Sequence, residues 1–306
     1  MDEYPLSLLF LPPELLIQIF DDVYKSWEDV EFPETRRLPI VPLCKALKEI
    51  QLEALYKNVK IRVDTRLSQL NKFFRAILAR PQLASFVTSL TFTVPKSSRY
   101  MIRPWGPPQV SNDSLRKCFR LFHNLQNLRI DTYALEGVPT LSALLSANFL
   151  SPNCTSITLT TFFRWSLDNL PSLPVNVKNL DFTFARDRVF MDLGSTPSTG
   201  SFAQSLSNLS HLSLRRPEGS FSLATRIISS CSNLASLNLL EIDSQLCLDT
   251  ICNLLPTPAG IIRLTISALQ DNPLSTDVVL RKFLNLNKLT LEGKLSTHSH
   301  AFFGAL

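Results

Sequence analysis

Residues whose types and spacing could support chemistry are few in this 306-residue chain. Of its four histidines only His298 and His300 stand close together, and they lack the neighbouring ligands that a metal site needs. Cys247 and Cys252, in CLDTIC, have the spacing of residues that pack one side of a helix. No Walker loop, G-x-S-x-G, G-x-G-x-x-G or H-E-x-x-H motif occurs. We therefore expect no enzymatic activity, no cofactor and no metal.

The remaining chemistry is recognition by basic side chains. We expect the candidate target-binding residues to be Arg129, His211, Arg215, Arg263 and Lys288. Arginine pairs with a carboxylate or a phosphate through a two-pronged fork, which adds geometric selectivity to charge. The Lys and Arg residues are scattered and never form a run with interleaved aromatics, so an acidic or phosphorylated partner is favoured over nucleic acid.

A repeated apolar pattern, loosely L-x-x-L-x-L, must position these residues. Clear copies are LQNLRI, VKNLDF, LSHLSL, LASLNL, IIRLTI and LNKLTL, and fainter ones are FVTSLTF and CTSITL. Their middle apolar positions are Leu90, Leu128, Ile157, Leu180, Leu212, Leu237, Leu264 and Leu289. Alternation with a period of two predicts a short strand in each copy, with the leucines inward and the intervening residues outward.

Helical patterns separate several of the predicted strands. SLRKCFRLFHNL, SLATRIISSCSNL and STDVVLRKFLNL each have apolar residues three or four positions apart. Strands that alternate with helices at this spacing predict an α/β solenoid whose stacked parallel strands form a curved sheet. The polar outward residues would then line its concave face. The alternative is an ordinary α/β protein in which the leucine clusters are coincidental.

The rhythm of the pattern resembles that of the leucine-rich-repeat family, whose period is about 20 to 29 residues. The resemblance implies a divergent solenoid of about seven to eight repeats over residues 63–306. The family usually places Asn or Cys three residues after the last strand leucine, and this chain does not. Instead an asparagine precedes the first leucine of several copies, at Asn124, Asn208, Asn233 and Asn285. We therefore expect the turns to be built differently.

The stretch LPPELLIQIFDDVY, residues 11–24, predicts a helix with an unusually wide apolar surface. Pro12 and Pro13 fit its first turn, where a missing N–H costs nothing. Its seven apolar side chains cover an arc of roughly 200°, about twice that of an ordinary apolar stripe. Either this is a fully packed core helix, or one side serves its own domain and the other serves a partner.

Three blocks, LPPELLIQIF, VPLCKALKEI and LYKNVKI, together resemble an F-box of the form common in fungal proteins. The resemblance implies a three-helix domain over residues 1–62 that docks on the Skp-type adaptor of a cullin ubiquitin ligase. The family contact positions correspond to Leu11, Pro12, Leu15, Ile19, Leu43 and Leu47. The family often has tryptophan where this chain has Leu47, so one large aromatic anchor is missing.

Composition and charge favour a protein of the cytoplasm, the nucleus or both. No run of about 18 apolar residues occurs, and the acidic N-terminus lacks a small-residue cleavage site, so we expect neither a membrane span nor secretion. The six cysteines form no CxxC pair and are expected to be reduced and mostly buried. Residues 1–60 are net negative and the rest is net positive, so the two parts face different surroundings.

Together, the two resemblances imply the substrate-recognition subunit of an SCF-type E3 ubiquitin ligase. The N-terminal segment would bind the Skp-type adaptor, and through it the cullin core, while the repeats hold an unidentified target protein. The alternative is a non-enzymatic leucine-rich-repeat scaffold with no role in ubiquitin transfer. In that case the N-terminal helices would form a cap that seals the first repeat.

Overall fold

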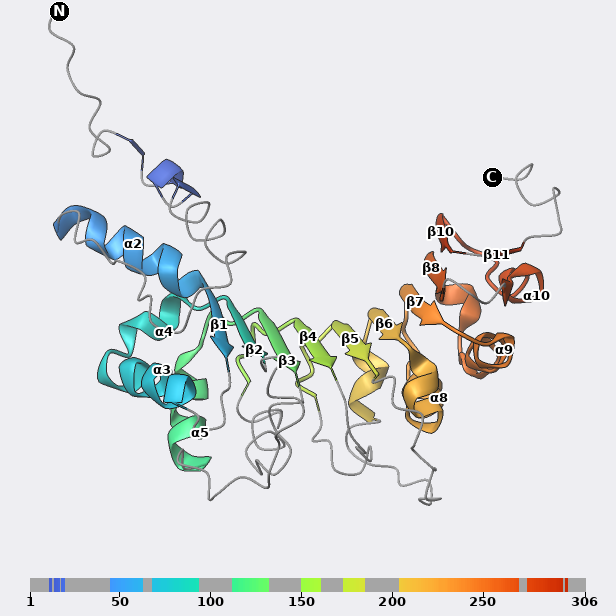
Figure 1. The fold of residues 1–306 in the computed structure, drawn as a ribbon, viewed down its shortest axis with the longest axis horizontal. Helices are drawn as coiled ribbons and strands as arrows, with labels where there is room; N and C mark the ends of the chain where they lie inside the picture. Colours follow the sequence, from blue (N-terminus) through green and yellow to red (C-terminus); the bar gives the residue numbers. More distant parts are fainter. Residues whose placement is uncertain are drawn as a thin grey trace, which may run out of the picture.

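A computed structural model describes residues 11–12, 14–16, 18–19, 45–62, 68–93, 112–131, 150–160, 173–184, 204–269, 274–293 and 295–296. Within them, nine parallel strands form one sheet whose spatial order follows the chain (Figure 1). The strands are β1 (Asn58–Arg62), β2 (Ser89–Thr93), β3 (Asn127–Asp131), β4 (Ser156–Thr160), β5 (Asn179–Thr183), β6 (His211–Arg215), β7 (Ser236–Ile242), β8 (Arg263–Ala268) and β10 (Lys288–Glu292). Figure 1 shows this sheet curving into an arc, with the strands along its concave side.

The strand register confirms the predicted repeat. The eight predicted middle positions, from Leu90 to Leu289, pair with one another in a single row that crosses the sheet strand by strand. The same row begins one strand earlier, at Val59 of β1, which pairs with Leu90. A one-residue slip would turn every leucine toward water, so this common register is strongly specified by the apolar pattern. The described chain is therefore a solenoid whose stacked parallel strands carry an apolar residue at the same register position.

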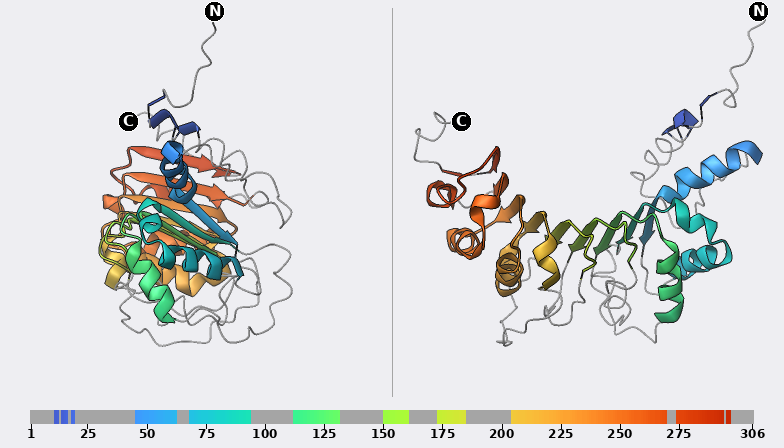
Figure 2. Two further views of the ribbon diagram at one scale, coloured as in Figure 1. Left: turned by 90° about the vertical axis from the view of Figure 1, so that its left-hand side faces the viewer. Right: turned by 180° about the vertical axis from the view of Figure 1, so that it is seen from behind.

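The core lies between the sheet and the helices on its convex side (Figure 2). Strands β2, β4 and β5 alternate half-buried and buried residues, as a sheet with one covered face requires. The helices are α3 (Ser68–Ala79), α4 (Gln82–Phe86), α5 (Asn112–Leu121), α8 (Phe221–Ser229), α9 (Gln245–Leu254) and α10 (Asp277–Leu280), with short 3-10 turns η5 (Leu206–Asn208), η6 (Pro217–Ser220) and η7 (Pro258–Gly260).

Phenylalanine fills the core beneath the first strands. Phe119 on α5 meets Phe122 edge to face, with ring centroids 5.5 Å apart, and also contacts Phe74 on α3 at 6.1 Å. Phe92 of β2 stacks on the same Phe119 ring. These rings fix α3 and α5 against the sheet, because each buried aromatic removes a large apolar area from water.

Asparagine side chains build the turns that precede the strands. Asn124, immediately before the first leucine of its repeat, donates a hydrogen bond from Nδ2 to the carbonyl of Ser85 in the preceding repeat, at 2.7 Å. Asn233 and Asn285 do the same to the carbonyls of Ser207 and Ala259. Equivalent bonds come from Asn153, Asn176 and Thr257. The prediction that these turns differ from the usual family pattern is thereby explained.

The C-terminal repeats differ in two details from the prediction. Of the predicted helix STDVVLRKFLNL only Asp277–Leu280 is helical. At the predicted start Ser275 instead pairs with a strand, in a small parallel ladder between β9 (Leu274–Ser275) and β11 (Leu295–Ser296), and turns follow Leu280. Gly293 closes β10 with a φ of +90°, and a side chain there would meet the Ala268 carbonyl oxygen at 2.7 Å, so only glycine fits.

The N-terminal segment joins the solenoid directly. Helix α2 (Lys45–Lys57) runs straight into β1, and its Leu52 and Tyr56 pack against the continuous core. The predicted boundary between residues 62 and 63 thus falls after the first strand of the sheet, not before it. The segment NVKIR alternates like the other strands, with Ile61 only 3% exposed. Residues 20–44, which include the end of the predicted first helix, lie outside the described residues.

Candidate functional site

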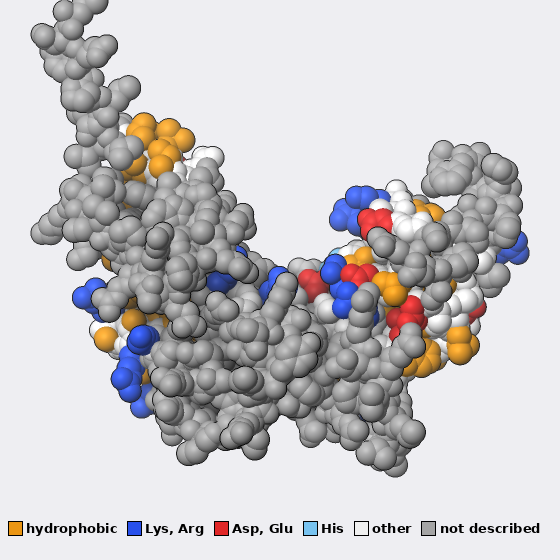
Figure 3. Space-filling model, viewed as in Figure 1, with side chains coloured by type: hydrophobic (Ala, Val, Ile, Leu, Met, Phe, Trp, Pro, Cys, Tyr) orange, Lys and Arg blue, Asp and Glu red, His pale blue; other side chains and the backbone are white. Residues whose placement is uncertain are grey.

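The polar side of the sheet is a candidate binding surface of the described chain. Register places many of its outward residues in two rows across the strands. The first row runs Asn58, Ser89, Asn127, Ser156, Asn179, His211, Ser236, Arg263 and Lys288. The second row runs Lys60, Thr91, Arg129, Thr158, Asp181, Ser213, Asn238, Thr265 and Thr290. Figure 3 shows basic side chains on both arms of the hollow that these rows line.

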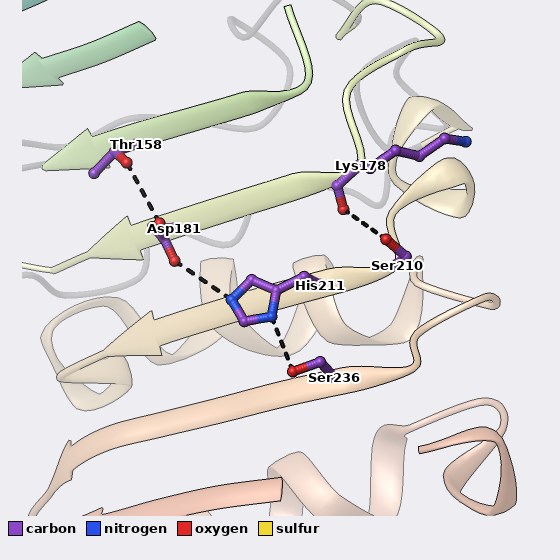
Figure 4. A network of polar contacts seen from close by, with 6 residues as sticks. All are labelled: Thr158, Lys178, Asp181, Ser210, His211 and Ser236. Carbon is purple, nitrogen blue, oxygen red and sulfur yellow. Dashed lines mark hydrogen bonds and ion pairs between the residues drawn. The ribbon is translucent and has the colours of Figure 1, made fainter. Parts of the chain in front are cut away.

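A polar network occupies the middle of this face (Figure 4). His211 Nδ1 lies 2.9 Å from Ser236 Oγ on the next strand, and its Nε2 lies 3.8 Å from Asp181 Oδ1 on the preceding one. Thr158 Oγ1 donates to the other oxygen of Asp181 at 3.4 Å. The predicted site residue His211 is therefore held from both sides, and its imidazole is oriented by its neighbours.

Arg215 ends β6 at the edge of the face, where it belongs to a second cluster of charged side chains. Its guanidinium lies 3.5 Å from Glu241 Oε1, and the neighbouring Arg216 also pairs with Glu241. Arg216 and Glu241 both adopt left-handed backbone, with φ of 57° and 55°. A β-bulge between Leu239 and Ile242 accompanies this geometry. The predicted site residue Arg215 is thus an ion-pair partner of a residue that the prediction missed.

Glu241 escaped the sequence analysis for a physical reason. Strict alternation along SLNLLEI would turn Glu241 toward the core and Ile242 toward water. The bulge shifts the phase by one residue, so Ile242 is fully buried and Glu241 reaches the arginines. A charged residue at a predicted inward position was the only signal in the sequence.

The other three predicted basic residues are also exposed on the concave face. Arg263 and Lys288 are direct cross-strand partners on β8 and β10, whereas Arg129 lies on β3 between Thr91 and Thr158. Among the described residues none of these three side chains has a hydrogen-bonding or ionic partner. The structure therefore separates the five candidates into two that are already paired and three with free charges.

The N-terminal candidates form a separate apolar surface. Leu15 and Ile19, one helical turn apart, are 47% and 40% exposed, while the adjacent Leu16 is only 3% exposed. Leu11 is half-buried and Pro12 is exposed. Leu43 and the side chain of Leu47 lie outside the described residues. The helix is therefore apolar both on a buried side and on a side that faces water.

The cysteines of the described chain do not form a reactive centre. Cys118, Cys154, Cys231, Cys247 and Cys252 are all buried and free. Burial raises the pKa of the Cys118, Cys231 and Cys252 thiols to about 12 and that of Cys154 to about 11, so all stay protonated at neutral pH. Burial also raises the pKa of Cys247, and the nearby Glu218 adds to the effect.

Two searches of the described residues were negative. No three His, Cys, Asp or Glu residues gather there in a way that could hold a metal ion. None of the helices described is long and apolar enough to cross a membrane. The predicted His298 and His300 lie outside the described residues.

Comparisons with known proteins gave a structural match only. No protein-family model and no curated protein matches the sequence. Among solved structures, the chain is similar to the leucine-rich repeat-containing protein LegL7 from Legionella pneumophila. That similarity has 17% sequence identity and a TM-score of 0.44, and it covers 77% of this chain and 83% of that one.

Proposed function

We propose that the chain is the substrate-recognition subunit of an SCF-type ubiquitin ligase. The F-box-like N-terminal segment would dock on a Skp-type adaptor, and the concave sheet face would hold a target protein. The chain would raise the effective concentration of its target near the ubiquitin-conjugating enzyme, without contributing catalytic groups of its own.

The exposed apolar side of the N-terminal helix is the observation that carries this proposal. A leucine or isoleucine side chain that becomes fully buried on binding contributes roughly 1.5 to 3 kcal/mol. Leu15 and Ile19 are neighbours on one side of the helix and keep 47% and 40% of their surface in water. With Leu16 already turned inward, the helix has one apolar side for its own chain and one for a partner.

The first prediction concerns this helix. Replacing both exposed residues, in L15E/I19E, should abolish co-purification with the Skp-type adaptor, because two carboxylates would be buried without partners in the interface. The solenoid should stay folded by circular dichroism. The matched control is Leu246→Glu on α9, which places the same charge on a leucine that is 74% exposed far along the chain.

Recovery of the adaptor should be unchanged in the Leu246→Glu control. Equal recovery with L15E/I19E and with the unmodified chain would contradict adaptor docking through this helix side.

A second candidate function is an interaction scaffold with a helical N-terminal cap and no ubiquitin role. It is favoured by helix α2, which continues into β1 and packs Leu52 and Tyr56 on the solenoid core, as a cap would. Such a scaffold should be a well-behaved monomer when it is purified alone. An F-box subunit should aggregate unless it is produced with its adaptor, and gel filtration of the two preparations distinguishes these functions.

A further inference from the structure

Arg263 and Lys288 make an unusual pair on the concave face. They are direct partners in the parallel ladder between β8 and β10, so their Cα atoms lie about 4.8 Å apart. Both side chains are exposed, and neither has a hydrogen-bonding or ionic partner among the described residues. Like charges at directly opposed positions of neighbouring strands destabilise a sheet. The repulsion between these two cations therefore destabilises the sheet, and a bound anion would offset that repulsion.

Two hydroxyl groups lie beside the pair. Thr265 and Thr290 follow two residues later on the same strands and are themselves cross-strand partners. Residues two apart along a strand lie about 6.6 Å apart on one face, so the four side chains occupy the corners of a small rectangle. We call this set, Arg263, Thr265, Lys288 and Thr290, the β8–β10 patch. The sheet that carries these strands is curved (Figure 1).

Other charges on the face are already matched or stand apart. Arg215 is paired with Glu241, which it shares with Arg216, and His211 lies between Asp181 and Ser236. Glu292 stands at the far end of β10, about 13 Å along the strand from Lys288, and it repels an anion from that end of the patch. The β8–β10 patch thus combines two positive charges with two neutral donors, and Glu292 follows Thr290 two residues later at one end of it.

We propose that the β8–β10 patch binds the phosphoryl group of a phosphorylated serine or threonine in the target protein. A phosphoryl group carries about −1.5 to −2 charges and three acceptor oxygens, which match two cations and two hydroxyl donors. A carboxylate offers one charge and two oxygens, so it would leave the like-charge repulsion only half compensated. This proposal names the chemical group that the chain would recognise in its target. It rests on the proposed function above only in taking the partner to be a protein.

The chemistry of the face favours a phosphopeptide over nucleic acid. Proteins that bind single-stranded RNA or DNA combine a basic groove with aromatic platforms on which bases stack. The outward residues of the nine described strands include no Phe, Tyr or Trp. Their free cations are also too sparse to follow a polynucleotide backbone, since Arg129 lies on β3, far along the sheet from β8.

Binding of two peptide pools to the full chain tests the proposal. One pool of short fluorescein-labelled peptides carries a central phosphoserine with randomised flanks, and the other carries serine at that position. Fluorescence anisotropy should show that the phosphorylated pool binds about tenfold more tightly, the effect of two charge-assisted contacts in a solvent-exposed site. The variant R263A/K288A should lose this preference. The control K72A/R75A removes two exposed cations from α3, off the strands of the concave face, and should keep it.

Thermal unfolding gives an independent readout. Sodium phosphate should raise the Tm of the unmodified chain more than sodium chloride does at equal ionic strength, and R263A/K288A should lose that excess. Equal binding of the two peptide pools, or loss of the preference in K72A/R75A as well, would overturn the site. Tighter binding of a random single-stranded RNA through the same two residues would overturn the assignment to a peptide.

A failure of the phosphoryl-binding proposal can be distinguished from a failure of the ubiquitin-ligase proposal. L15E/I19E should retain phosphopeptide binding whether or not the adaptor docks, because its substitutions lie outside the sheet. Conversely, R263A/K288A should co-purify with the adaptor as the unmodified chain does. Each double variant therefore tests one surface alone.

Discussion

Single asparagine side chains tie several repeats of the solenoid to the repeat before them. Asn233 donates to the Ser207 carbonyl at 2.7 Å, and Asn285 donates to the Ala259 carbonyl at 2.8 Å. Both carbonyls lie in turns, where no strand partner can reach them. A side-chain amide satisfies such a group without lengthening the turn, which explains why the same residue type returns before the first leucine of several repeats.

Replacing Asn233 with alanine should lower the free energy of unfolding by about 1 kcal/mol, the usual net contribution of one hydrogen bond. Urea unfolding followed by circular dichroism measures the change. Asn287→Ala serves as the control, because Asn287 is exposed and its side chain has no partner among the described residues. That control should stay within about 0.5 kcal/mol of the unmodified chain. Equal losses in both variants would refute the role of the turn bond.

A second residue-scale effect is the left-handed backbone at Glu241, where φ is 55°. A residue with a Cβ pays roughly 1 kcal/mol there and glycine does not. Glu241→Ala and Glu241→Gly both remove the ion pairs with Arg215 and Arg216, so the comparison isolates the backbone term. The glycine variant should be more stable than the alanine variant by about 1 kcal/mol in urea unfolding. If the alanine variant were the more stable of the two, the strain of the left-handed backbone at residue 241 would not decide the difference between them.

At the scale of elements, the strands were predictable and their exact ends were not. Alternation of leucines with a period of two is a local property, so it placed eight strands and their common register from the sequence alone. β1 was missed because NVKIR carries valine and isoleucine instead of leucine and follows a helix without a break. The bulge in β7 was missed because it depends on arginines contributed by another repeat.

The helices were harder to predict than the strands. Helix α10 is one turn long, and its predicted start at Ser275 pairs with β11, a contact that only the folded chain reveals. For the N-terminal helix, periodicity gave the width of the apolar arc but not which side is covered. The structure shows which side is covered, because Leu16 is buried whereas Leu15 and Ile19 are exposed. The basic candidates were placed on the right face, but their pairing depends on neighbours from adjacent repeats.

At the scale of the whole molecule, each repeat is stabilised mainly by its neighbours. The order of the strands in the sheet follows their order along the chain. Every inner strand is therefore flanked by the strands of the previous and the next repeat. Stability of such an array is approximately a sum of repeat terms and interface terms. The last strand has a partner on one side only within the described residues, and its apolar side chains are correspondingly less covered.

Two leucines in the same register row therefore should differ in their contribution to stability. Leu212 of β6 is fully buried, whereas Leu289 of β10 is only half-buried. Leu212→Ala should cost about 3 kcal/mol, because it leaves a cavity between two packed repeats. Leu289→Ala should cost about 1 kcal/mol, because water and side-chain shifts fill part of the lost volume.

Urea unfolding of the two variants measures this difference, and amide hydrogen exchange locates it. Amides of β10 should exchange faster than those of β6 in the unmodified chain, because β10 pairs with one strand of the sheet among the described residues and β6 pairs with two. Leu289→Ala should accelerate exchange in β10 and β8 and leave β6 protected, whereas Leu212→Ala should accelerate exchange on both sides of β6. Uniform acceleration across all strands in both variants would mean that the solenoid unfolds as one unit and that the nearest-neighbour description is wrong.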